Sequence, residues 1–136
     1  MPICFGISFT NTFMNQASAL VHIYSDGSVG ISTGAVEMGQ GVNEKIRKVA
    51  STIFSINIDR IKIETSNTTR AANTSPTAAS SAADLNGKAT ETACKDLLDK
   101  ITKAAAELLN VQDYNQIEIK DERVYYKNIK TEINWN

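Results

Sequence analysis

A helical pattern of apolar residues between two alternating runs is the feature that most constrains the fold of this chain. The alternating runs begin at Val29 and at Ile61, and each is typical of a strand. The helix is predicted over residues 42–55, and its apolar face consists of Val42, Ile46, Val49, Ala50, Ile53 and Phe54. A strand, a helix and a strand in this order form a crossover, which normally places both strands parallel in one sheet.

Three further patterns complete the expected elements. A strand over residues 17–24 should pair with the strand at Val29 through a two-residue type I′ turn at Asp26-Gly27. A long helix is predicted over residues 82–109, and Gly87 inside it suggests close backbone packing. The apolar stripe of this helix comprises Leu85, Ala89, Ala93, Leu97, Leu98, Ile101, Ala105 and Leu108. Short alternating runs at 117–119, 124–126 and 133–135 predict a terminal hairpin or meander, and residues 66–81 read as loop.

The predicted fold class is α+β. We expect a mixed β-sheet covered on one face by the two main helices, with a βαβ crossover and a terminal hairpin. A chain of 136 residues is long enough for one core, so residues 1–136 are expected to form a single domain.

Charge and hydropathy exclude several classes of partner. With 14 Lys and Arg against 15 Asp and Glu, the net charge of -1 gives no basic field for nucleic acid or an anionic membrane. No apolar run is long enough to span a membrane and no secretory signal is visible, so a cytoplasmic location is expected. Cys4 and Cys94 are isolated in sequence, which favours buried free thiols.

Two loops, each directly before a predicted helix, are the candidate functional segments. Gly39 and Gly41 allow a close backbone approach, and Gln40 between them supplies a neutral donor and acceptor. N–H groups at a helix N-terminus could bind an anion or a polar cofactor. The second loop, residues 77–80, offers small side chains and hydroxyls. From spacing alone, a tight turn at the first loop and a solvated connector at the second are the more common interpretations.

The segments "DGSVGISTGAVEMGQGVNEKIRKVA" and "NTSPTAASSAADLNGKATETAC" together resemble the molybdenum-cofactor-binding portion of the xanthine dehydrogenase and aldehyde oxidase family. The resemblance covers most of the chain from Gly6 to about Leu109, and "TSPTAAS" leans toward the xanthine dehydrogenase branch. It implies that the molybdenum is held by a molybdopterin cofactor, and no residue of this chain is expected to bind the metal. It also implies oxidative hydroxylation of a purine or related N-heterocycle in the parent enzyme.

The resemblance assigns roles to individual residues. Gln40 matches the glutamine that hydrogen-bonds an oxygen ligand of the molybdenum, and Gly39 and Gly41 flank it at the cofactor. Ala78 and Ala79 match the alanine pair that lines the substrate pocket, and Ala79 with Ser80 matches the segment that holds the pterin.

No catalytic residue is expected in this chain. Glu37 is a tempting general base, but the family's catalytic glutamate lies in a Gly-x-Gly-Glu motif that is absent here, so Glu37 is interpreted as structural. FAD and iron–sulfur clusters are implied on other domains or subunits, and the remainder of the molybdenum subunit is the implied partner. The fragment alone is therefore expected to be inactive.

Two alternatives from other functional classes remain open. One is a non-catalytic carrier module that binds a pterin or an anion at its helix N-termini. The other is a structural interaction domain whose terminal hairpin pairs with another chain. His22 is expected to be a half-buried strand residue, and Tyr125, Tyr126 and Trp135 are expected to be core residues rather than a partner surface.

Overall fold

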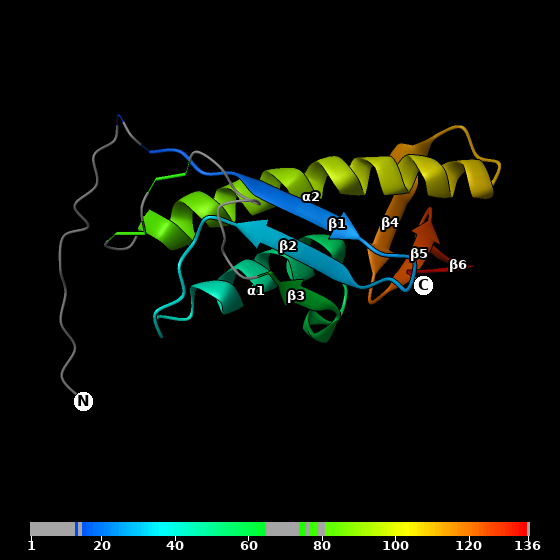
Figure 1. The fold of residues 1–136 in the computed structure, drawn as a ribbon. Coiled ribbons are helices and arrows are strands. Elements are labelled where there is room, and N and C mark those ends of the chain that lie inside the picture. Colours follow the sequence, from blue (N-terminus) through cyan, green and yellow to red (C-terminus); the bar gives the residue numbers. More distant parts are fainter. Residues whose placement is uncertain (1–12, 14, 65–73, 76, 79–80, 136) are drawn as a thin grey trace.

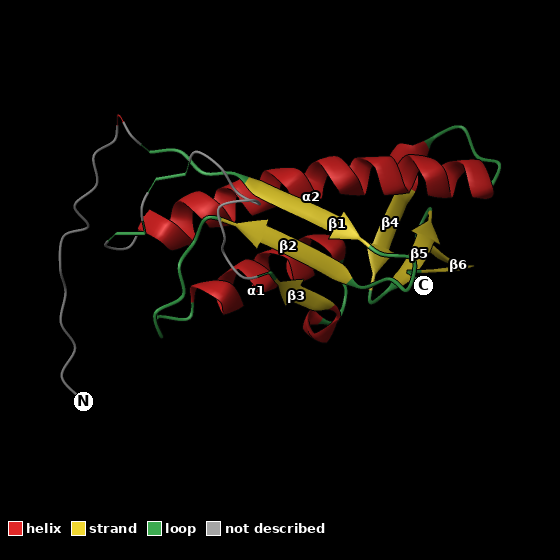
Figure 2. Cartoon of the chain, in the orientation of Figure 1, coloured by secondary structure: helices red, strands yellow, loops and turns green. Residues whose placement is uncertain are grey.

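The computed structural model describes residues 13, 15–64, 74–75, 77–78 and 81–135 (Figure 1). The elements in chain order are β1 (Ala19–Ile23), β2 (Val29–Thr33), α1 (Val42–Phe54), β3 (Ile61–Ile63), α2 (Ser81–Leu108), β4 (Ile117–Lys120), β5 (Arg123–Tyr126) and β6 (Ile129–Asn134). Short 3-10 turns at Ile58–Arg60 and Tyr114–Gln116 precede β3 and β4. The class is α+β, as predicted (Figure 2).

The first sheet has the strand order β1-β2-β3. β1 pairs with β2 antiparallel, from Ala19 opposite Thr33 to Ile23 opposite Val29. β2 pairs with β3 parallel, with Val29 opposite Ile61. The predicted crossover through α1 is therefore confirmed, and the sheet is mixed.

The turn between β1 and β2 differs from the predicted type I′ turn. The N–H of Gly27 donates to the carbonyl of Tyr24 at 2.9 Å, and Gly27 alone has a positive φ, at 75°. A type I′ turn needs a positive φ at both central residues. Asp26 instead keeps a negative φ and accepts from the Ser28 N–H at 2.9 Å, so the Asp26 carboxylate closes the turn.

Both helices pack on the first sheet in one apolar cluster, as predicted. α1 buries Val42, Ile46, Ala50 and Phe54, which lie on one helical face. This face shares a core with Val21, Val29 and Ile31 of the sheet and with Ala82 and Cys94 of α2.

The buried face of α2 is rotated from the predicted stripe. Its buried residues near the N-terminus include Asn86 and Thr90, whose side chains donate to the helix carbonyls of Ala82 at 2.9 Å and Asn86 at 2.8 Å. These bonds within the helix let two polar side chains occupy the core face. Leu108, predicted to be buried, is 72% exposed. A helix stripe read from apolar residues alone misses polar positions whose donors bind carbonyls of the same helix, although the buried Asn86 Oδ1 accepts no hydrogen bond in the described part of the chain.

Gly87 does not mark close backbone packing, which corrects the sequence prediction. A Cβ at this position would meet nothing within 4 Å. Glycine inside a helix costs about 1 kcal/mol relative to alanine, so we expect Gly87→Ala to raise the free energy of unfolding by about that amount in urea titrations. Gly41→Ala is the matched comparison: Gly41 has φ 74°, where alanine costs about 1 kcal/mol. Equal destabilisation by both variants would contradict this account.

The terminal strands form the predicted meander as a separate sheet, in the order β4-β5-β6. Asp121 and Glu122 both have positive φ, at 47° and 62°, as do Lys127 and Asn128, at 50° and 63°. These values match two-residue type I′ hairpin turns. The meander packs against the end of α2 through Ile117, Val124, Ala105 and Ala106.

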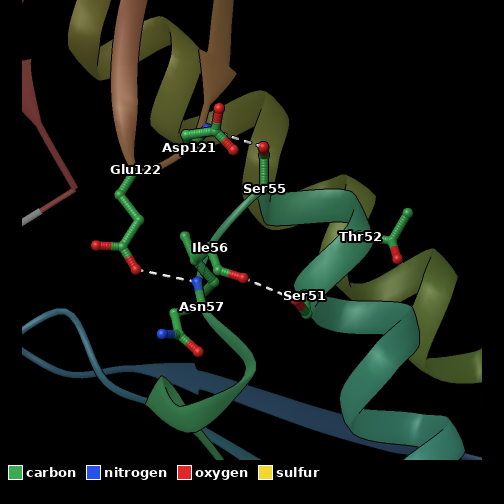
Figure 3. A pocket seen from close by; sticks show the side chains of 7 residues that line it. All are labelled: Ser51, Thr52, Ser55, Ile56, Asn57, Asp121 and Glu122. Atoms are coloured by element: carbon green, nitrogen blue, oxygen red, sulfur yellow. Dashed lines mark hydrogen bonds between the residues drawn. The ribbon is translucent and has the colours of Figure 1, made fainter.

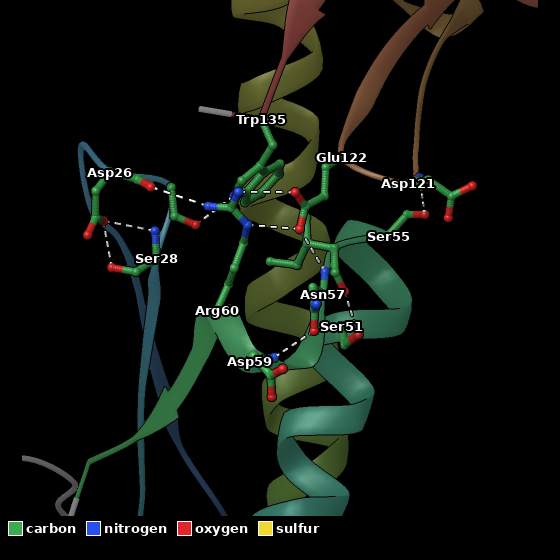
Figure 4. Close-up of polar contacts among 12 residues, drawn as sticks. Asp26, Ser28, Ser51, Ser55, Asn57, Asp59, Arg60, Asp121, Glu122 and Trp135 are labelled. Atoms are coloured by element: carbon green, nitrogen blue, oxygen red, sulfur yellow. Dashed lines mark hydrogen bonds and ion pairs between the residues drawn. The ribbon is translucent and has the colours of Figure 1, made fainter.

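A polar junction joins the meander to the first sheet (Figure 4). Arg60 donates to Glu122 twice, from Nε to Oε1 at 2.8 Å and from Nη2 to Oε2 at 3.1 Å. Glu122 Oε1 also accepts from the Asn57 N–H at 3.0 Å. Trp135 contacts the Phe54 ring at 5.3 Å between centroids and donates from Nε1 to the Gly27 carbonyl at 2.7 Å. The prediction of core packing is confirmed for Trp135 and for Tyr126, which pack against the first and second clusters, but Tyr125 belongs to neither cluster.

Candidate functional site

The loop between β2 and α1 is organised around the Glu37 carboxylate. Glu37 Oε1 accepts from the N–H groups of Gly39 at 2.9 Å and Gly41 at 3.0 Å, and Oε2 accepts from Asn43 at 3.0 Å. These backbone hydrogen bonds, led by that of Asn43, lower the pKa of Glu37 below its usual range. The carboxylate therefore supplies the negative group that the N-terminus of α1 favours. This arrangement confirms the structural interpretation of Glu37.

Gln40 sits at the tip of the same loop, between two glycines with positive φ, 95° at Gly39 and 74° at Gly41. Its Nε2 donates to the Val36 carbonyl at 2.7 Å, and its Oε1 accepts from the Met38 N–H. The side chain is exposed and its orientation is fixed by these two bonds.

The loop contacts the segment that leads into α2. The Val36 N–H donates to Thr77 Oγ1 at 2.9 Å. A Cβ at Gly34 would lie 2.2 Å from Thr74 Oγ1 and 2.7 Å from both Thr74 Cβ and Cγ2, so only glycine admits Thr74 at this distance. Two segments far apart in sequence thus meet at the end of β2, on the left of Figure 1.

The predicted site residues Ala78, Ala79 and Ser80 lie at the end of the segment that leads into α2. Ala78 is exposed, and its carbonyl accepts from Ser81 Oγ at 2.7 Å at the start of α2. Ala79 and Ser80 lie outside the described residues. The contacts therefore join the first loop to Thr74 and Thr77, which come directly before the predicted pocket residues.

The prediction that the glycine-rich loop offers free N–H groups to a ligand is wrong for Gly39 and Gly41. Both N–H groups donate to Glu37, as does that of Asn43. Their hydrogen-bonding capacity is used within the chain, so what this loop presents outward is the Gln40 side chain. The sequence showed the acid near the helix start but not that it would reach three amides.

One hollow of the surface borders the loop between β2 and α1, and another lies away from this loop. One of about 620 Å³ borders the loop at Glu37 and Gly41 and extends to β3. Another of about 490 Å³ is lined by the C-terminal end of α1 and by Asp121 and Glu122 (Figure 3). The second hollow lies at the opposite end of α1 from Gln40, so it does not belong to the candidate site.

Other reactive side chains are not at this site. Cys94 is fully buried, as predicted, and burial raises the pKa of its thiol to about 12, so it is a poor nucleophile. Cys4 lies outside the described residues. His22 lies on β1 as predicted but is exposed rather than half-buried. Within the described ranges, no group of three or more His, Cys, Asp or Glu side chains is placed to hold a metal ion.

Gly34 and Thr74 are site residues that the sequence prediction missed. The interpretation concentrated on Met38-Gly39-Gln40-Gly41, whereas the contact between segments is made at the preceding glycine. The available signal was a glycine directly after the strand, at the start of the loop, but this signal does not identify the residue that packs against it.

Comparisons with known proteins identify the family. The family model described as "Molybdopterin cofactor-binding domain" matches residues 1–136. Xanthine dehydrogenase 2 of Arabidopsis thaliana is 44% identical over 106 residues, which is 78% of this chain and 8% of that protein. Xanthine dehydrogenase/oxidase of Mus musculus is 50% identical over 101 residues, 74% of this chain and 8% of that protein.

Solved structures show the same fold. Reconstituted CO dehydrogenase from Oligotropha carboxidovorans superposes with a TM-score of 0.76 at 29% identity, over 85% of this chain and 14% of that one. Quinoline 2-oxidoreductase from Pseudomonas putida 86 superposes with a TM-score of 0.72 at 22% identity, over 82% of this chain and 14% of that one. In the part of the chain that the structure describes, no helix has the length and apolar character to cross a membrane.

The sequence resemblance to the molybdenum-cofactor-binding portion of xanthine dehydrogenase is confirmed by these matches. The chain spans only 8% of the length of these two curated relatives. It belongs to the molybdopterin cofactor-binding domain family.

Proposed function

We propose that this chain is part of the molybdenum-binding subunit of a xanthine dehydrogenase-like hydroxylase. Its role there is to contribute the loop with Gln40 and the segment with Ala78, Ala79 and Ser80 to the cofactor site. The single observation that carries this proposal is the contact between the two segments through Gly34 and Thr74 and through Val36 and Thr77. In open sheets with parallel strands, ligands bind at the carboxyl ends of the strands, where this contact lies.

The chemistry of Gln40 fits the molybdopterin group. A glutamine amide carries two N–H protons, and only one hydrogen bond from Nε2, to the Val36 carbonyl, is seen in the described part of the chain. The second proton can be donated to an oxygen of the cofactor without adding charge to the site. When bound, the molybdenum centre supplies the electron transfer that hydroxylation of the substrate requires. Gly39 and Gly41 serve the loop conformation, because their N–H groups are used by Glu37.

The remainder of the subunit is the proposed partner. Val36 is 46% exposed and Met38 is 71% exposed, so the apolar side chains that flank the loop lack cover from the described part of this chain. A chain that spans 8% of its curated relatives leaves most of a subunit to provide that cover, the substrate contacts, and the FAD and iron–sulfur centres. A purine or related N-heterocycle as substrate, and a cytoplasmic location, remain predictions.

The anion-carrier alternative is not favoured. Such a module needs free N–H groups at a helix N-terminus, and at α1 the N–H groups of Gly39, Gly41 and Asn43 already bind Glu37. The interaction-domain alternative, based on the terminal hairpin, has less support than family membership gives to the cofactor site.

The proposal predicts that Gln40→Ala in the parent enzyme lowers kcat by about ten- to a hundredfold, because it removes one oriented hydrogen-bond donor. Folding stability should change little, since Gln40 is exposed. Gln112→Ala is the matched control, because Gln112 is an exposed loop residue remote from the site in sequence. Steady-state kinetics, molybdenum content and thermal unfolding check the prediction. Unchanged kcat and molybdenum content in Gln40→Ala would remove the role of Gln40.

A further inference from the structure

The Glu37 carboxylate holds the loop that carries Gln40 from both sides. It accepts from Gly39 before Gln40, at 2.9 Å, and from Gly41 after it, at 3.0 Å. Its second oxygen accepts from Asn43 at 3.0 Å, which ties the loop to the first turn of α1. One side chain therefore holds the backbone on either side of Gln40 and also links this loop to the start of α1.

The backbone conformation around Gln40 needs this support. Gly39 and Gly41 adopt φ values of 95° and 74°. Glycine has access to many other conformations, so its own preference does not hold the backbone at these values. A loop with two glycines would lose its ordered shape without bonds that favour one conformation. Charge-assisted hydrogen bonds to a carboxylate are about twice as strong as neutral ones.

We propose that Glu37 is a positioning residue of the cofactor site, which acts through Gln40 by fixing the direction in which the Gln40 carboxamide points. This inference rests on the proposed function of Gln40. The family match and the segment contact concern where the site lies, whereas this proposal concerns what holds its donor in place. It gives Glu37 a defined part in the site without making it an acid or a base.

A neutral amide cannot replace the carboxylate in this role. Glu37 accepts hydrogen bonds at both Oε1 and Oε2. A glutamine would keep one acceptor oxygen and place an NH₂ group where the other oxygen accepts from an N–H, so two donors would face each other. The substitution Glu37→Gln therefore removes at least one bond of the set with almost no change in side-chain size.

The first arm of the test is nuclear magnetic resonance of the 136-residue chain without cofactor. In Glu37→Gln, we expect the amide signals of Gly39, Gly41 and Asn43 to shift, and the Gln40 carboxamide protons to move to the position of a freely rotating glutamine. Glu44→Gln is the matched control, because Glu44 lies in the first turn of α1 but pairs with Arg47 instead. Gln40 carboxamide signals that stay unchanged in Glu37→Gln would overturn the proposal.

The second arm is a double-mutant cycle in the parent enzyme. If Glu37 acts through Gln40, Glu37→Gln should lower kcat by about tenfold alone and cause no further loss in a Gln40→Ala background. Independent, multiplicative losses would show that Glu37 acts elsewhere and would overturn the proposal. If Gln40→Ala alone left kcat unchanged, the proposed function would fail, and the resonance experiment would still decide whether Glu37 orients Gln40.

Discussion

Gly34→Ala is expected to separate the Gln40 loop from the segment that leads into α2. The added Cβ would lie 2.2 Å from Thr74 Oγ1 and 2.7 Å from Thr74 Cβ, and the second of these atoms cannot be moved by rotating the side chain. Overpacking of this kind costs about 1–3 kcal/mol, and the backbone at Thr74 and Thr77 should move away from Val36. In the parent enzyme, we expect loss of most of the bound molybdenum, measured by elemental analysis, together with a lower urea midpoint.

Two further variants separate the clash with Thr74 from a general effect of alanine on the sheet. Gly30→Ala is the control within β2, because the atoms nearest its Cβ would belong to the side chain of the half-exposed Tyr24, at 3.1 Å, which can move outward. In a Thr74→Gly background the obstacle is absent, so Gly34→Ala should then cost much less in molybdenum content and in stability. A Gly34→Ala enzyme with normal molybdenum content and stability would contradict the observed packing.

Glu122→Ala is expected to have the largest effect on stability away from the site. It removes both hydrogen bonds from Arg60 and the bond from the Asn57 N–H, and it leaves the half-buried Arg60 guanidinium without its carboxylate. Bonds to charged groups contribute about 1.5–3 kcal/mol, so we expect a loss of about 2–3 kcal/mol in urea unfolding. Glu118→Ala is the control, because Glu118 pairs with Lys120 on the exposed face of the same hairpin. Equal losses in the two variants would contradict a special role for the junction.

The difference between wild type and Glu122→Ala should depend on pH. The hydrogen bond from Arg60, followed by that from the Asn57 N–H, holds the pKa of Glu122 below its usual range. A carboxyl group with a depressed pKa in the folded state stabilises fully above its unfolded pKa, and this stabilisation is lost as the pH falls through the folded pKa. The stability difference should therefore be constant near neutral pH and shrink as the solution is acidified below the usual glutamate pKa. A difference that stayed constant under acid conditions would argue against the charged pair.

The parts of the fold that follow from local pattern were predictable from sequence. The crossover through α1, the parallel pairing of β2 with β3 and the bounds of both main helices followed from apolar periodicity. The type of the Asp26-Gly27 turn could not be predicted in this way, because the Asp26 side chain accepts from Ser28 and stabilises a conformation that the dipeptide alone does not specify. The buried face of α2 could not be predicted either, because Asn86 and Thr90 satisfy their donors within the helix.

The candidate site was predictable as a motif, but the contacts that shape it were not. The sequence indicated Gly39, Gln40 and Gly41 as a group, and the structure adds that Glu37 occupies the N–H groups of both glycines. The contact between Gly34 and Thr74 could not be predicted, because it joins residues distant in sequence through the absence of a side chain. Periodicity reports which face of an element is buried, and it carries no information on which loops touch.

The most direct test of the central claim is a nuclear Overhauser measurement on the 136-residue chain. The claim is that the Gln40 loop and the segment before α2 are held together at the end of β2. Cross-peaks are predicted between the Gly34 α-protons and the Thr74 methyl group, and between the Val36 amide proton and the Thr77 side chain. Complete absence of both sets, in spectra where contacts across β1 and β2 are resolved, would contradict the account.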